Sequence, residues 1–161
     1  MAVDYFLKVE GAPGESQDSK HPNEIQLESF SFGTTQTGTF GAGGGGGGGK
    51  ANFQDFHFTM KVNKASPVLF LKCATGTHIP TAFLTCRKVG GKQEEFVKWK
   101  FTDLLVGSFT TSGHGAGDDL PMESVSLNFA QLEVEYAEQN KDGSLKAPVK
   151  AGYNLKKADK V

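Results

Sequence analysis

The sequence has little of what secreted, membrane-spanning or nucleic-acid-binding proteins carry in abundance. Its 17 basic and 18 acidic residues give a net charge of −1, so no excess of positive charge is available to bind a phosphate backbone or an anionic membrane. No apolar run approaches the roughly 18 residues that would span a bilayer. Residues 1–11 lack the basic start and the apolar stretch of a secretory signal. We therefore expect cytoplasmic synthesis, no nucleic-acid partner, no membrane insertion, and export only by a machine that reads no signal peptide.

Cysteine and metal-ligand patterns are scarce as well. Cys73 and Cys86 form no CxxC motif, and cytosolic proteins rarely keep a disulfide, so we expect two thiols that pack as small apolar groups. The four histidines lie in separate segments without the helical i, i+4 spacing of a metal site. His114 with Asp118 and Asp119 is the one conceivable weak metal site, but three ligands from a single glycine-rich loop have no visible supporting residues. We expect no metal.

No residue pattern typical of an enzyme is present. The chain has no GxSxG motif for a nucleophilic serine. Residues 44–50 match the phosphate-loop pattern GxxxxGK, but Ala51 stands where a Ser or Thr would bind magnesium. The residues that follow predict a strand, not the helix whose N-terminus would hold a phosphate. The sequence therefore predicts a protein that is not an enzyme and that has no cofactor.

Alternating apolar and polar residues dominate what the sequence does contain. A length of 161 residues suits one domain, covering residues 1–161. Period-2 patterns predict strands over residues 3–9, 24–32, 56–62, 78–89, 95–110, 123–138 and 149–155. Short hairpin connections join most of them. The patterns predict a mainly β fold, a closed antiparallel β-barrel with one short α-helix and an extended Gly-rich loop over residues 36–50.

One short helix is predicted after the third strand. Ser66 is a suitable N-cap, Pro67 occupies the permitted first position, and Gly76 ends the helix. Val68, Leu71 and Ala74 recur at helical spacing, and Leu69 and Phe70 widen this apolar face. A helix of this length is expected to plug one end of the barrel.

Two of the predicted strands change phase along their length. In residues 24–32 the apolar positions are first Ile25 and Leu27 and then Phe30 and Phe32, and residues 123–138 change in the same way. Either each strand contains a bulge, or its two ends bury opposite faces. In the second case the extra apolar surface would meet another copy of the chain, in a head-to-tail contact that closes into a ring or continues as a filament.

Several segments together resemble the haemolysin-coregulated protein (Hcp) family of type VI secretion. They are SFGTTQTGTF, the polyglycine tract ending in GK, FQDFHFTMKVNKASPVLFLKCATGTHIPTAFLTCRKVGG and VSLNFAQLEVEY. The resemblance covers essentially the whole chain and is specific in combination. One departure is Asn63, which replaces the frequent Asp of a DKASP-like motif before the helix and should barely affect the helix start.

The resemblance implies the tube protein of a contractile secretion machine. Family members form hexameric rings with a wide channel, and the rings stack into a tube inside a sheath, capped by a spike. The implied partners are other copies in a homo-hexamer, the spike, the sheath and baseplate, and effector proteins in the lumen. The protein would be cytoplasmic before firing and then be delivered outside the cell or into a target cell. Because the chain ends at Val161, we expect a plain tube subunit without a fused toxin.

Two sets of residues are candidates for contacts in that assembly. Ser29 and Ser31 alternate with phenylalanines and are predicted to face the lumen and contact effectors. The glycine-rich loop is predicted to reach an adjacent protomer or ring, through Thr37, Phe40, Gly43, Gly49 and Lys50. The alternative from another class is a monomeric barrel that binds a small ligand inside, with this loop as a lid.

Overall fold

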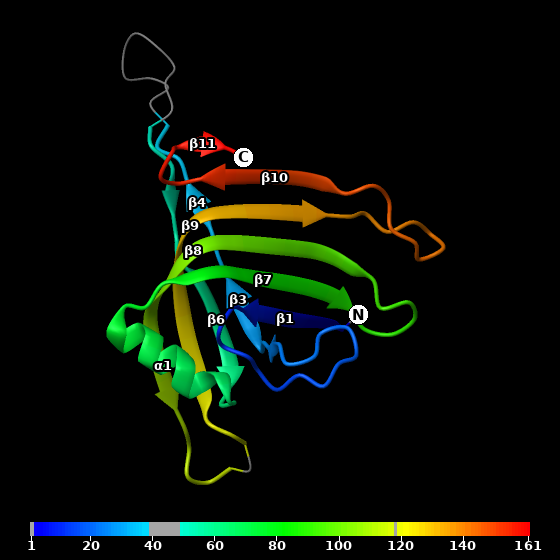
Figure 1. Cartoon of the computed structure of the whole chain (residues 1–161). Coiled ribbons are helices and arrows are strands. Elements are labelled where there is room, and N and C mark those ends of the chain that lie inside the picture. Colours follow the sequence, from blue (N-terminus) through cyan, green and yellow to red (C-terminus); the bar gives the residue numbers. More distant parts are fainter. Residues whose placement is uncertain (1, 39–48, 118) are drawn as a thin grey trace.

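The computed structural model describes residues 2–38, 49–117 and 119–161. These residues form eleven strands and one helix (Figure 1). The strands are β1 (Val3–Val9), β2 (Ile25–Gln26), β3 (Ser29–Ser31), β4 (Thr34–Thr35), β5 (Asn52–Phe53), β6 (Phe56–Lys61), β7 (Ile79–Lys88), β8 (Glu95–Ser112), β9 (Met122–Tyr136), β10 (Val149–Asn154) and β11 (Asp159–Lys160). The helix is α1 (Ala65–Thr75). The mainly β fold with one helix is confirmed.

The strands belong to one sharply bent antiparallel sheet and a small two-stranded ladder. The order in the large sheet is β11-β10-β9-β8-β7-β1-β2, and β6 leaves this path to pair with β9 and β3. In Figure 1, β7 to β10 run side by side across the upper half, and β8 and β9 then turn down to lie beside β6. The remaining pair, β4 and β5, is separate from the sheet ladder.

The predicted closed barrel is not confirmed. Between β2 and β3 the chain turns a corner, where Leu27 N donates to Tyr5 O and Glu28 N donates to Thr59 O, both at 2.9 Å. These two bonds join the β2–β3 corner to β1 and to β6, but they do not form a continuous ladder between β2 and β3. On the other side, β9 changes partner along its length, from β6 to β10. Among the described residues, no ladder joins β10 to the β4–β5 hairpin, so the hydrogen-bonded sheet stays open there.

The phase changes in the sequence mark bends in the strands. In β8, Phe101 and Leu104 are both fully buried, although they are three residues apart. Asp103 between them has a φ of 56°, in the left-handed region, which turns the strand so that both neighbours point into the core. β9 bends at the same level, because Phe129 and Leu132 pair with Leu104 and Phe101 and are buried with them.

The same explanation holds for the segment that contains β2 and β3. Ile25 and Leu27 are in the core, and Phe30 and Phe32 pack against that same core after the corner. The idea that the two ends of these strands bury opposite faces is therefore wrong for the described residues. Where a strand bends at one residue, the side chains that point inward change from odd-numbered to even-numbered positions. A single core can therefore receive both sets of side chains.

The core lies inside the bend and is rich in phenylalanine. Phe56 contacts Phe101 with ring centroids 4.8 Å apart, and Phe101 contacts Phe129 at 5.1 Å. Buried aliphatic side chains from β1, β7 and α1 surround these rings, including Leu7, Leu69, Ile79 and Leu84. Packing of this kind fixes the two halves of the sheet against each other.

The helix starts and faces differently from the prediction. It begins at Ala65, before the predicted N-cap Ser66, and Asn63 Oδ1 accepts a hydrogen bond of 2.9 Å from Ala65 N. The Ser66 hydroxyl instead accepts from Asn63 N at 3.0 Å and donates to the buried Glu123 carboxylate. The predicted end is correct, since Gly76 has the left-handed φ of 65° that favours glycine.

The predicted apolar face of the helix is only partly buried, since it included the buried Leu69 but also exposed residues. Ala65, Ser66 and Leu69 are the buried residues of α1, whereas Leu71 is 59% exposed. Ala74 is exposed as well. The apolar side chains of α1 occupy two sides of the helix, so spacing alone did not determine which side meets the core.

Candidate functional site

Small polar side chains cover the outer face of β3, β6, β9 and the second half of β8. Strand pairing aligns them in two cross-strand rows, Ser29–Thr59–Ser124–Thr110 and Ser31–His57–Ser126–Ser108. We call these eight residues the small polar face, in which Ser126 is the one buried member, at 3% exposure. The predicted lumen residues Ser29 and Ser31 are both exposed and begin the two rows. Sequence analysis missed the other six, although the alternation of Ser and Thr with core residues in all three strands was a visible signal.

Hydroxyl groups of the small polar face bond mostly to one another. Ser29 Oγ lies 2.5 Å from Thr59 Oγ1, and Ser108 Oγ lies 2.6 Å from Ser126 Oγ. A shallow hollow of about 310 Å³ lies over Ser29, Ser31 and His57. Such a surface offers donors and acceptors to a partner without long side chains that would have to be ordered.

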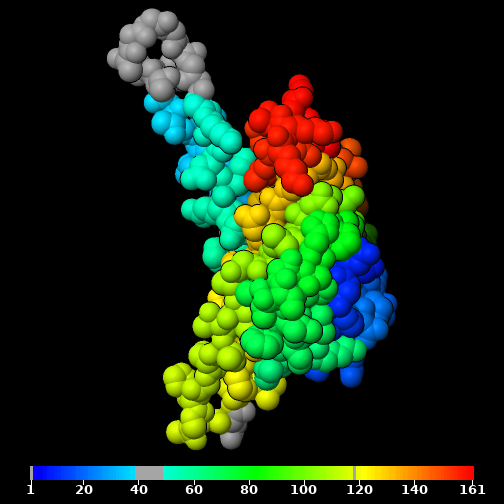
Figure 2. Space-filling model, turned by 60° about the vertical axis from the view of Figure 1, so that its left-hand side comes forward, coloured from blue at the N-terminus to red at the C-terminus, as the bar shows by residue number. Residues whose placement is uncertain are grey.

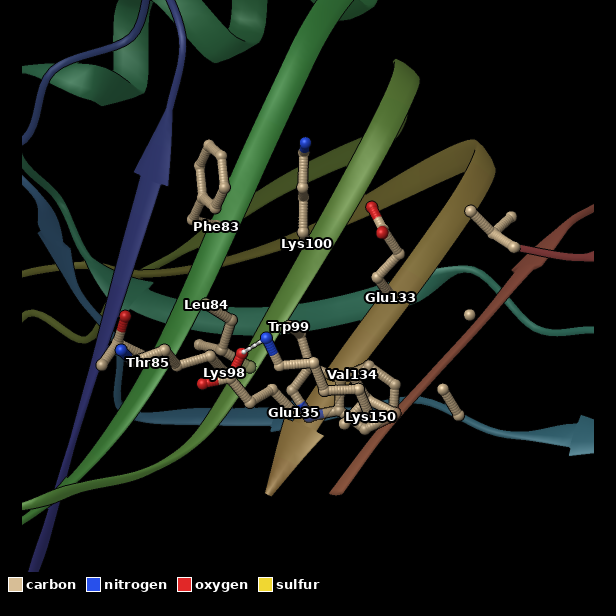
Figure 3. A pocket seen from close by; sticks show the side chains of 13 residues that line it. Phe83, Leu84, Thr85, Lys98, Trp99, Lys100, Glu133, Val134, Glu135 and Lys150 are labelled. Carbon is tan, nitrogen blue, oxygen red and sulfur yellow. Dashed lines mark ion pairs between the residues drawn. The ribbon is translucent and has the colours of Figure 1, made fainter. Parts of the chain in front are cut away.

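Long charged side chains cover the outer face of the other half of the sheet. Here the rows are Thr85–Lys98–Glu135–Lys150 and Phe83–Lys100–Glu133–Gly152 (Figure 3). We call Lys98, Lys100, Glu133, Glu135 and Lys150 the charged face. A hollow of about 440 Å³ lies above it. The patterns KWK and EVE in the sequence could have indicated this face, because each places one charged residue on either side of an inward residue.

The contacts on the charged face are those of solvated side chains. Lys150 Nζ lies 3.4 Å from Glu135 Oε2, and the Lys100 ammonium lies 5.8 Å from the centre of the Phe83 ring. Exposed pairs of this kind contribute little to stability. The charged side chains can therefore exchange their ion-pair partners with little loss of stability.

The β4–β5 hairpin carries the described part of the predicted glycine-rich arm. Figure 2 shows the far end of this segment, in cyan, projecting beyond the body of the molecule, whereas Phe53 of β5 packs against Phe129 and Tyr153. Gly49 N donates to Thr37 O at 2.9 Å, so the two sides of the arm are paired at its base. Lys50 is exposed. Phe40 and Gly43 lie outside the described residues.

A buried arginine ties the long N-terminal loop to the sheet. Arg87 is 3% exposed, and its Nη2 donates to Asp18 at 2.7 Å and to Asp4 at 3.2 Å. Its guanidinium lies 4.8 Å from the centre of the Phe6 ring. The hydrogen bond from Arg87 holds the pKa of Asp18 well below its usual range. The hydrogen bonds to these carboxylates also raise the pKa of Arg87, although burial opposes the shift.

His21 makes a second attachment beside the first. Its Nδ1 lies 2.8 Å from Glu24 Oε2, its Nε2 lies 2.6 Å from Glu95 Oε1, and its ring stacks on Phe6 at 4.6 Å. Burial by itself would raise the pKa of Glu95, but the hydrogen bond with His21 lowers it below its ordinary value. We call the side chains of Asp4, Asp18, Arg87, His21 and Glu95 the charged cluster.

Neither cysteine is in a disulfide. Cys73 is half-buried on α1 and Cys86 is buried in β7. Burial raises the pKa of the Cys86 thiol to about 11, so this sulfur stays protonated and unreactive near neutral pH. The predicted packing of both as small apolar groups fits these positions.

Two further features are absent from the part of the chain that the structure describes. Within it, no three His, Cys, Asp or Glu side chains come together in a way that could hold a metal ion. Likewise, no helix among these residues has the length and apolar character needed to cross a membrane.

Comparison with known proteins identifies the class of protein. The model of the family described as "Type VI secretion system effector, Hcp" matches residues 6–136. Protein hcp1 of Pseudomonas aeruginosa is 44% identical over 158 residues, which cover 97% of each chain. The chain therefore belongs to the Hcp family of type VI secretion proteins. This is a family of secreted structural proteins that is not known for catalysis.

Solved structures agree with this assignment. The crystal structure of Hcp1 from Salmonella typhimurium is 34% identical, with a TM-score of 0.81 over 99% of this chain and 100% of the other. A structure described as a type six secretion system protein has a TM-score of 0.94 at 28% identity and the same coverage. The bent sheet with one helix is thus the Hcp fold.

Proposed function

We propose that the chain is the structural subunit of a type VI secretion tube and has no catalytic role. Six copies form a ring, the rings stack into a tube, and the small polar face of each copy lines the channel. Membership of the Hcp family supports the tube, and the eight small polar residues in two rows of four are the observation that supports the lining.

The small polar face has the properties that a channel wall requires. A wall that must hold a protein cargo and later release it should offer many weak hydrogen bonds. Exposed serine and threonine hydroxyls do this, and each contributes only a small net free energy because water competes for the same groups. Ser29 and Ser31 are the proposed effector contacts, and His57 between Ser31 and Ser126 extends the same surface.

The remaining partners follow from the same proposal. The charged face lies on the other half of the bent sheet and would point away from the channel, toward the sheath and baseplate. The arm that includes Thr37, Phe40, Gly43, Gly49 and Lys50 would contact an adjacent protomer or ring, and one end of the tube would meet the spike. The protein would be cytoplasmic until the sheath contracts and would then leave the cell.

Ser31→Gln tests the lining. The longer side chain should project into the channel and reduce the amount of effector that copurifies with the ring from the secreting bacterium, while the ring stays intact. Ser19→Gln is the matched control, because Ser19 is an exposed serine in the N-terminal loop. Light scattering after size-exclusion chromatography reports the ring. Normal effector recovery with Ser31→Gln would contradict the lining, and a wild-type monomer would favour the ligand-binding alternative.

A further inference from the structure

Helix α1 is apolar on its outer side as well as on its inner side. Pro67, Phe70, Leu71 and Ala74 follow the i, i+3, i+4, i+7 spacing of one helix face, and all four are exposed. Phe70 and Leu71 are 58% and 59% exposed. We call these four residues the α1 stripe. A helix that is apolar all round is normally covered on every side, but the core of this chain covers α1 only through residues such as Ala65 and Leu69.

A second apolar surface lies where the sheet stays open. The inward row Leu7–Leu84–Trp99–Val134–Ala151 crosses five strands, from fully buried residues on β1 and β7 to exposed Ala151 on β10. In the next row, exposure reaches 48% at Tyr136 and 73% at Val149. These strands are apolar on their inner side to the last strand. The β4–β5 hairpin covers part of this end, where Phe53 stacks on Tyr153 with ring centroids 5.3 Å apart, but Tyr136, Val149 and Ala151 stay exposed.

A cavity of about 220 Å³ lies in this opening. Phe32 and Phe53 form one wall, and Trp99, Val134 and Ala151 form the other. Only apolar atoms are exposed on its walls. We call this groove the seam. It lacks the few convergent polar groups that orient a small ligand in a specific binding site, and it has room for one or two large apolar side chains.

We propose that the α1 stripe of one copy docks in the seam of the next copy. This inference rests on the proposed ring and names the contact that builds it. The seam and the stripe belong to different elements of one chain, so the contact is head-to-tail, and a ring leaves neither surface uncovered. The spacing of the stripe is the one by which an amphipathic helix lies in an apolar groove.

A second copy explains both surfaces at once, which other occupants do not. A lipid or another small apolar molecule could fill the seam but would leave Phe70 and Leu71 in water. An unrelated protein could cover one surface and would need a separate partner for the other. The near-zero net charge of −1 also adds little electrostatic repulsion between copies.

Disulfide trapping tests the contact directly. Leu71→Cys and Ala151→Cys are combined in a Cys73→Ser background, and the purified protein is oxidised. A head-to-tail contact predicts a ladder of covalent dimers, trimers and larger species in denaturing gels, because each copy can link to two neighbours. Each single variant should give no ladder. Leu71→Cys with Lys100→Cys, whose second cysteine lies on the charged face, is the matched control and should give none.

A surface substitution separates failure of this contact from failure of the ring. Leu71→Asp should weaken assembly by at least about tenfold in the concentration needed for half association, with the melting temperature of the monomer unchanged. Leu120→Asp, at an equally exposed leucine of 57%, should assemble normally. A monomeric wild type would overturn the ring and this inference together. An oligomeric wild type, with Leu71→Asp still assembling and no ladder, would overturn the contact alone.

Discussion

The small polar face and the charged cluster use polar side chains for opposite purposes. On the small polar face, hydroxyl groups such as Ser29 and Thr59 bond to each other on a surface, and the sheet beneath is held by its own core. In the charged cluster, Arg87 and His21 are buried and hold a long loop against β1, β7 and β8. Burial is the difference, because a desolvated charge that loses its partner costs far more than a hydroxyl that returns to water.

The largest expected effect is on the charged cluster. Arg87→Met should lower the free energy of unfolding by about 2–3 kcal/mol, since it removes the partner of Asp18 and Asp4 and releases the loop. Lys150→Met on the charged face, where the lysine is 68% exposed, is the control and should change it by less than about 0.5 kcal/mol. Urea denaturation measures both. Equal changes in the free energy of unfolding for the two variants would contradict the distinction between buried and exposed charges.

Acid should also act on the charged cluster first. Hydrogen bonds from Arg87 and with His21 lower the pKa of Asp18 and of Glu95 below their ordinary values of 3.8 and 4.5. A carboxyl whose pKa is lowered by folding adds stability above its unfolded pKa, and this is lost as pH falls through the folded pKa. The melting temperature should therefore drop as pH falls below about 4.

Asp18→Asn isolates the contribution of that carboxylate to the acid response. The variant should melt lower than the wild type at neutral pH, and its melting temperature should depend less on pH in the acid range. Calorimetry at matched ionic strength measures this dependence. Parallel curves for the two proteins would show that the Asp18 carboxylate is not linked to folding.

The smallest expected effect is on the small polar face. Ser29→Ala and Thr59→Ala, alone or together, should change the free energy of unfolding by less than about 0.5 kcal/mol, because their mutual hydrogen bond is exposed to water. Urea denaturation provides the measurement. A loss comparable to that of Arg87→Met would show that this face stabilises the fold and is not simply available to partners.

Much of the fold could be predicted from local patterns. The alternation in Val3–Val9 and Phe56–Lys61 marked strands correctly, and Gly76 marked the end of α1. These features depend on neighbouring residues, whose backbone preferences the chain carries wherever it lies.

The candidate surfaces were harder to predict from the sequence than the strands were. Ser29 and Ser31 were identified, but their alignment with His57 and Ser126 depends on register between strands that are distant in the sequence. The charged cluster was missed entirely, because Asp18 and His21 sit in a loop whose composition indicated only turns. Arg87 comes from a strand almost seventy residues later.

The sequence by itself determined that this chain forms a mainly β domain with one short helix and belongs to the Hcp family, since alternation, caps and family motifs are all local properties. Only the tertiary structure decided that the sheet bends at Asp103 and stays open beside β10, and that Leu71 of α1 points to solvent. Apolar spacing says that a side chain should be covered. It does not say whether the cover comes from the same core or from another molecule, and that choice depends on how all the strands pack together.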